Sequence, residues 1–170
     1  TAYNMPFMCD AGDITAEDLL SICHVLIERH EAFRTTFKIV DEEIVQEIHS
    51  DISFNIERYV LDSGALPDTL FAAFVRPFDL SMAPLLRVAL VNGDKNYIFI
   101  DLHHIIADGA SIEIITNEID ALKNGVALPL LNLQYRDYSE WALSHKAEIK
   151  DQESYWISRF DDEIPVLSLS

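Results

Sequence analysis

Apolar residues recur along this chain in two different periods, which predict helices and strands in alternation. Apolar positions 19, 20, 23, 26 and 27 follow helical spacing and predict an amphipathic helix that ends near His30. Thr15 and the acidic residues after it suit the start of that helix. Further helices are expected at 66–75, at 110–123, at 136–150 and at 152–160.

Runs of β-prone residues between these helices predict strands. One strand is expected at 3–14 and another at 52–60. Two hairpins are predicted, the first from 33–40 with 44–48 and the second from 85–91 with 97–103. Because strands and helices are interspersed, the pattern indicates an α/β or α+β fold.

The composition excludes several classes of protein. With 170 residues, 49% of them hydrophobic, the chain suits one domain or one lobe of a larger domain. Its net charge of −17 argues against nucleic acid as a partner, because the phosphates would be repelled. No apolar run approaches the roughly 20 residues of a membrane helix, so no membrane partner is expected. The first residue is not Met, and we expect a piece of a longer protein.

The two cysteines favour a reducing compartment. Cys9 and Cys23 lack the spacing of a redox or metal motif, and Cys23 lies in the apolar pattern of the first helix. This placement favours a buried thiol over a disulfide or a metal ligand. The simplest compartment is therefore the cytoplasm.

The segment at 103–111 holds the strongest candidates for chemistry. His103 and His104 follow a β-prone run, and the carboxylate of Asp108 comes four residues after the second imidazole. Gly109 is next, and then the helix expected at 110–123 begins. A base on a turn at a strand end is where α/β folds place chemistry, because the scaffold is rigid there and the side chain can reach substrate.

Spacing limits what these groups can do together. Neighbouring side chains on a strand point to opposite faces, so His103 and His104 cannot enter one pocket without a bulge. This weakens a metal site, and no third ligand stands at a metal-site spacing. Asp108 can accept a hydrogen bond from an imidazole or pair with an arginine that holds the turn. Gly109 permits a conformation or a close approach that a β-carbon would block. The first amides of the next helix would favour developing negative charge.

The segment at 103–109, HHIIADG, resembles the HHxxxDG signature of the condensation domains of nonribosomal peptide synthetases. These domains belong to the chloramphenicol-acetyltransferase-like superfamily, and epimerization domains and wax-ester-type acyltransferases share the signature. Four further segments resemble family motifs in the same order: 29–37 (RHExLRTxF, with Phe33 for Leu), 76–87 (RPFDLxxxPLLR), 135–141 (YxDFAxW) and 152–167 (QxxYWxxxLxxxPxxL). On these five matches the chain is identified as a member of the condensation-domain family.

The resemblance implies a fold and a place in a larger domain. Family members are V-shaped pairs of similar α/β lobes, each a mixed sheet with flanking helices, and the active-site tunnel runs between them. The family's opening motif should precede residue 1 and its later motifs should follow residue 170, so we expect 1–170 to be a slightly truncated N-terminal lobe without its C-terminal lobe. Such a lobe alone is expected to be inactive and to expose an apolar patch that favours self-association.

The resemblance also implies the reaction and its partners. The amine of an acceptor attacks the thioester of a donor, and both are held on phosphopantetheine arms of peptidyl carrier domains. No Gly-Gly-x-Ser attachment context occurs in the chain, so no cofactor is expected on the chain itself.

Within the signature, the resemblance assigns the acting role to His104, as base, as positioning group or as charge stabiliser. It implies that His103 is a support facing away from the tunnel. Asp108 is expected to be structural and to pair with Arg34, with Arg29 and Arg87 as alternative partners. Gly109 is expected to have a conformational role.

Two other functions fit parts of the sequence. An epimerization domain would use the same His104 to move a proton at an α-carbon, but such domains tend to have Trp where Ile112 stands. A non-catalytic docking module of the same fold would recruit partner proteins, although it would not need an intact HHxxxDG. Tyr135 and Trp141 are expected to pack in the core.

Overall fold

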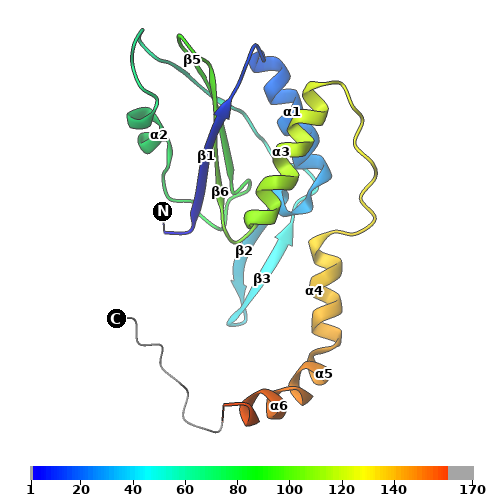
Figure 1. Cartoon of the computed structure of the whole chain (residues 1–170). Helices are drawn as coiled ribbons and strands as arrows, with labels where there is room; N and C mark the ends of the chain where they lie inside the picture. Colours follow the sequence, from blue (N-terminus) through cyan, green and yellow to red (C-terminus); the bar gives the residue numbers. More distant parts are fainter. Residues whose placement is uncertain (1, 161–170) are drawn as a thin grey trace, which may run out of the picture. The chain divides into compact units, whose positions relative to one another are not determined.

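Two compact units make up the computed structural model, which describes residues 2–160 (Figure 1). The first unit ends at Leu131 and the second begins at Asn132. Residues 161–170 lie outside the described part, and with them lies the end of the segment at 152–167 that resembles a family motif. The first unit contains both histidines of the signature and therefore the predicted site.

A four-stranded mixed sheet forms the centre of the first unit, in the order β1-β6-β5-β4. Its strands are β1 (Asn4–Asp10), β4 (Glu57–Val60), β5 (Leu86–Asn92) and β6 (Tyr97–His103). β6 pairs antiparallel with both β1 and β5, whereas β4 pairs parallel with β5. A parallel neighbour needs a crossover, which here contains the short helix α2 (Asp68–Phe74). The predicted α/β class with a mixed sheet is confirmed.

Helices cover both faces of this sheet and bury its two central strands. α1 (Ala16–Arg29) and α3 (Gly109–Lys123) lie side by side on one face, and α2 lies on the other (Figure 1). Leu102 belongs to the core under α1 and α3, whereas Phe99 packs against Phe71 and Phe74 of α2. Strands that are buried on both faces are apolar almost throughout, which explains the continuous β-prone run in the sequence.

The first predicted hairpin is present but starts later than expected. Glu31–Arg34 forms a 3₁₀ turn that buries Phe33, and β2 (Thr35–Val40) begins after it. β2 pairs with β3 (Glu43–Ile48) in a separate two-stranded sheet. The two residues of its turn, at 41 and 42, have φ of 50° and 67°, which matches the right-handed twist of the strands they join.

Three predicted elements are wrong in extent. The strand expected at 3–14 ends at Asp10 as β1, and the residues after it form a turn. The strand expected at 52–60 is limited to β4, because its first half has no strand partner in the sheet. The helix expected at 136–150 is divided into α4 (Tyr135–Ser144) and α5 (Lys146–Asp151). His145 separates the two helices, because its φ of −99° and ψ of 12° lie outside the helical region. The helix expected at 152–160 is α6 (Glu153–Ser158).

The second unit presents aromatic side chains to solvent. Tyr135 and Trp141 of α4 are 59% and 53% exposed, and Trp156 of α6 is 57% exposed. No described side chain of α4 or α6 is buried. Within the second unit taken by itself, Tyr135 and Trp141 are therefore not part of a core, contrary to the predicted core packing.

A Phe99→Ala substitution tests the core on the α2 side of the sheet. The Phe99 ring is fully buried and lies 5.0 Å from the Phe71 ring and 5.7 Å from the Phe74 ring. Its removal leaves a cavity, and we expect the free energy of unfolding in urea to fall by about 3–5 kcal/mol. Ile39→Ala, at a position 74% exposed, should change it by less than about 0.5 kcal/mol. Equal effects of the two substitutions would contradict this assignment of the core.

Candidate functional site

The predicted chemical segment forms a turn between the central sheet and α3. His103 is the last residue of β6, and its carbonyl accepts from the N–H of Ile106 at 3.1 Å. The N–H of His104 donates to the carbonyl of Tyr3 at 2.7 Å, beside the start of β1. Asp108 then begins α3 as its N-cap. Both ends of the turn are therefore tied to regular elements of a rigid scaffold.

The two histidine side chains occupy different environments. The His103 ring is partly buried, and its centroid lies 6.2 Å from that of Tyr3 and 6.1 Å from that of Phe78. Its Nδ1 accepts from the N–H of Ile105 at 3.1 Å, so the neutral ring carries its proton on Nε2. Burial lowers the pKa of His103 and favours this neutral form. His104 is exposed, so the two imidazoles do not share a pocket, as strand alternation predicts.

Asp108 caps α3 through reciprocal hydrogen bonds with Ser111. Its Oδ1 accepts from the Ser111 hydroxyl at 2.7 Å and from the Ser111 N–H at 2.9 Å. The Asp108 N–H in turn donates to the Ser111 hydroxyl at 3.1 Å. The hydroxyl and then the amide hold the pKa of Asp108 below its usual value. The carboxylate thus satisfies a free N–H of the helix and complements the positive helix end.

This cap changes the role expected for the first amides of α3. The N–H of Ser111 is occupied by the Asp108 carboxylate and is not free to stabilise an oxyanion. The negative charge on that carboxylate would also repel a second negative charge nearby. The Ser111 N–H is therefore not available for the role that we expected of the first amides of α3.

The predicted pairing of Asp108 with Arg34 is wrong as well. The Arg34 guanidinium donates to the carbonyls of Ile27 at 3.0 Å, His49 at 2.5 Å and Glu28 at 3.3 Å. Arg34 follows the end of α1, where the last carbonyl groups lack hydrogen-bond partners within the helix. Its guanidinium donates hydrogen bonds to these carbonyls. Asp108 needs no arginine because Ser111 supplies its donors locally.

The alternative arginines also have other partners. Arg29 Nε donates to Glu118 Oε1 at 2.9 Å, and Glu118 Oε2 lies 2.6 Å from His30 Nε2. Arg87 pairs with Asp101 at 2.9 Å. The Glu118 cluster joins the end of α1 to α3, which gives His30 a polar partner where only helix-end packing was expected.

Gly109 does not need to be glycine for the backbone conformation of this chain. Its φ is not positive, and a β-carbon built on it would meet no atom within 4 Å. The predicted conformational role of Gly109 is therefore wrong. Open space in front of its Cα leaves the close approach of a substrate as the remaining reason for a glycine here.

Asp101 is a polar residue of the site region that the sequence reasoning missed. It is fully buried on β6, and its Oδ2 accepts from Arg87 at 2.9 Å and from Asn4 at 2.7 Å. Burial raises the pKa of Asp101. A carboxylate inside an apolar strand run was the available signal, because such a group is rarely buried without a partner.

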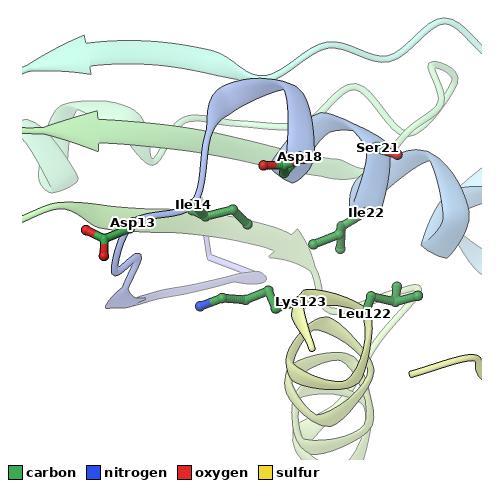
Figure 2. A pocket seen from close by; sticks show the side chains of 7 residues that line it. All are labelled: Asp13, Ile14, Asp18, Ser21, Ile22, Leu122 and Lys123. Carbon is green, nitrogen blue, oxygen red and sulfur yellow. The ribbon is translucent and has the colours of Figure 1, made fainter. Parts of the chain in front are cut away.

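A hollow lies at the other end of α3 from the histidine turn. It has a volume of about 500 Å³. Figure 2 shows its lining, with Lys123 at the end of α3 and Ile22 of α1 around it. The 15 residues of α3 span about 22 Å, so this hollow and the turn are well separated. The hollow is not part of the histidine site.

The described residues contain neither a candidate metal site nor a candidate membrane-spanning helix. Among residues 2–160 no group of three or more His, Cys, Asp or Glu side chains is arranged to hold a metal ion. None of the helices described there is long and apolar enough to cross a membrane. Cys9 and Cys23 are free thiols, and burial raises the pKa of Cys23 to about 12.

The geometry agrees with a family that matches the chain from end to end. The family model described as Condensation domain matches residues 1–170. The chain belongs to the condensation-domain family. It is 43% identical to bacitracin synthase 3 of Bacillus licheniformis and 40% identical to gramicidin S synthase 2 of Aneurinibacillus migulanus, each across 99% of this chain. It spans 3% and 4% of the length of those two relatives, respectively.

Solved structures share the fold of this condensation-family chain. The condensation domain from the Monacolin K polyketide synthase MokA superposes with a TM-score of 0.82 at 21% identity, over 98% of this chain and 40% of that chain. The epimerization domain from the third module of tyrocidine synthetase B superposes with a TM-score of 0.80 at 21% identity, over 97% and 42%. The expected chloramphenicol-acetyltransferase-like fold is confirmed, and these likenesses show the fold alone.

Replacement of Asp108 by Asn should destabilise the chain in a pH-dependent way. The folded pKa of Asp108 lies below its unfolded value of about 3.9, so the carboxylate contributes stability above that value. This contribution is lost as the pH falls through the folded pKa. We therefore expect Asp108→Asn to lower the melting midpoint at pH 7 and to lose its effect in acid, once the pH lies below the folded pKa of Asp108.

Asp120→Asn provides the matched control at the other end of α3. A carboxylate in the last turn opposes the negative helix end, so its removal should leave the midpoint unchanged or raise it. Equal loss in both variants, or an Asp108→Asn effect that persists in acid, would argue against the carboxylate charge as the source of this stability.

Proposed function

We propose that residues 1–170 form the N-terminal lobe of a condensation domain that makes peptide bonds in nonribosomal peptide synthesis. The observation that supports this most is the placement of His104, an exposed imidazole on a turn that is held at both ends. In this proposal a C-terminal lobe completes the domain. The coverage of 40% and 42% of two solved chains supports a second lobe of this kind.

The reaction joins an acceptor amine to a donor thioester. The amine nitrogen forms a bond to the thioester carbon, the carbon–sulfur bond breaks, and the thiol leaves. The nitrogen must lose a proton during this exchange and the sulfur must gain one. We assign this proton transfer to His104, because an imidazole can both accept and donate a proton and this side chain is exposed.

In this proposal the other signature residues hold the turn that carries His104. His103 is held neutral between two aromatic rings and does not exchange protons with substrate. Asp108 fixes the start of α3 through Ser111. Arg34 supports the same region indirectly by closing the end of α1. Gly109 leaves open space beside the turn for a substrate.

The proposed substrates arrive on phosphopantetheine arms of a donor and an acceptor peptidyl carrier domain. The chain itself binds no cofactor, and the second lobe supplies the other wall of the tunnel around the exposed His104. Free Cys9 and Cys23 suit a reducing compartment, and we place the protein in the cytoplasm. Nucleic acid and membranes are not partners in this proposal.

The alternatives are disfavoured by particular residues. Ile112 stands where epimerization domains tend to have Trp, and the segment at 29–37 follows the condensation pattern. A structure described as a complex of the X-domain and OxyB from teicoplanin biosynthesis shares the fold at a TM-score of 0.76 and 24% identity, which keeps a docking module as the second candidate. The intact pair His103 and His104 with Asp108 favours catalysis over docking.

Substitution of His104 tests the proposed reaction. In the whole protein, His104→Ala should lower the rate of dipeptidyl product formation with loaded carriers by about 10²–10⁴-fold, as loss of an acid–base group does. His104→Gln should be equally slow, because an amide can hydrogen-bond but cannot accept the proton. His24→Ala, at an exposed position on α1, is the control and should retain full activity. Full activity in His104→Ala would remove the assignment, and activity in His104→Gln would make His104 a positioning group.

The isolated chain provides a second test. Residues 1–170 alone should form no product with loaded carriers, because a tunnel wall is missing from one lobe. The chain should also associate with itself in sedimentation experiments, since exposed apolar side chains such as Leu130 (91%) and Leu133 (75%) remain uncovered. Turnover by this fragment at the rate of the whole protein would contradict the two-lobe proposal.

A further inference from the structure

A buried polar cluster lies at the end of β6, on the face of the sheet that α2 covers. Asp101 stands two residues before His103, so the two side chains share a face. Both Arg87 and Asn4 donate to Asp101 Oδ2, at 2.9 Å and 2.7 Å. Asp101 Oδ1 is buried and has no hydrogen-bond partner within residues 2–160.

This carboxylate is poorly explained by stability alone. A buried acceptor without a partner costs free energy, and an apolar residue of similar size would fill the same space without that cost. The carboxylate compensates the charge of Arg87, whose side chain is only 15% exposed. Asp101 therefore serves to hold a partly buried guanidinium in one place.

The guanidinium of Arg87 fixes the segment at 76–78 in three ways. Nη1 donates to the carbonyl of Arg76 at 2.6 Å, and Nη2 donates to the carbonyl of Pro77 at 2.6 Å. Its central carbon lies 3.6 Å from the centroid of the Phe78 ring. A planar fork that hydrogen-bonds and stacks at once is a property of arginine that lysine lacks.

The Phe78 ring, which Arg87 holds in place, contacts the histidine turn. It meets the His103 ring edge to face, at 6.1 Å and 90°. His103 in turn accepts from the N–H of Ile105 through Nδ1, and its carbonyl accepts from the N–H of Ile106. The His103 ring and the His103 carbonyl therefore both hold the backbone that follows His104.

We propose that Asp101 and Arg87 are positioning residues for His104, acting through Phe78 and His103 on the turn at 103–106. Neither residue touches a substrate in this proposal. It rests on the proposed function in one respect, that His104 takes part in the reaction.

Steady-state kinetics of the whole protein with loaded carriers test this inference. Arg87→Lys keeps the charge but loses the fork and the stacked plane. We expect kcat to fall about tenfold to a hundredfold, as a displacement of about 1 Å does at other sites, with KM for the acceptor unchanged. Arg58→Lys on β4, whose side chain is 58% exposed, is the matched control and keeps full activity.

Phe78→Leu tests the route, because it removes the ring from a partly buried position but keeps apolar bulk there. Since both changes act along one path, the double variant should be no slower than the slower single variant. If Arg87→Lys fails to fold, Phe78→Leu alone must reproduce the loss of kcat. Melting midpoints measured in parallel separate this loss from general destabilisation.

The outcomes distinguish this inference from the proposed function. Unchanged kcat in Arg87→Lys together with an inactive His104→Ala would overturn the positioning role and leave the proposed function intact. Multiplicative losses in the double variant would overturn the route through Phe78. Full activity in His104→Ala would overturn the proposed function, and the positioning role with it.

Discussion

The antiparallel pairing of β5 with β6 determines where the residues of the site can lie. Its register places Leu86 opposite Leu102 and Arg87 opposite Asp101. Helices cover both faces of this strand pair, so a slip by one residue would send every side chain of β6 into the wrong core. The position of the end of β6 is therefore fixed by the packing of the core. The turn that carries His104 follows directly and is positioned by the same packing.

Ion pairs among the apolar residues connect segments of the chain in a defined orientation. The hydrophobic effect alone would not do so, because it is not directional. Burial of an ion pair adds little net stability, because desolvation offsets the attraction between the charges. The Asp101 pair connects the central sheet to the loop after α2, and Glu118 connects α3 to Arg29 at the end of α1. Both clusters thus direct chain segments around the histidine turn, while the apolar cores supply the stability of the unit.

Apolar periodicity was sufficient to predict the elements that bury a face locally. α1, α3 and both hairpins have strong patterns of this kind, and the structure contains all of them. The pattern was misleading for Tyr135 and Trp141, because an apolar stripe does not show whether a partner covers it. The strand expected at 52–60 failed for a related reason, since only β4 finds a neighbour in the sheet.

The site was predictable where one local rule decides the outcome. Strand alternation alone separated His103 from His104. The partner of Asp108 was not decided in this way, because a carboxylate before a helix can bind a distant arginine or a nearby N–H. The spacing of Asp108 and Ser111 contained the capping signal. Asp101 has no local partner, since Arg87 and Asn4 lie 14 and 97 positions away, and only the folded chain brings them together.

The opposed positions of Arg87 and Asp101 also constrain how this sequence can diverge. Loss of either residue leaves the other as an uncompensated charge in the interior, which is more damaging than loss of both. Single substitutions that remove one of the two charges are therefore disfavoured relative to changes of both residues. Among descendants of this sequence, positions 87 and 101 should covary or stay fixed together, independently of the rate at which the neighbouring surface changes.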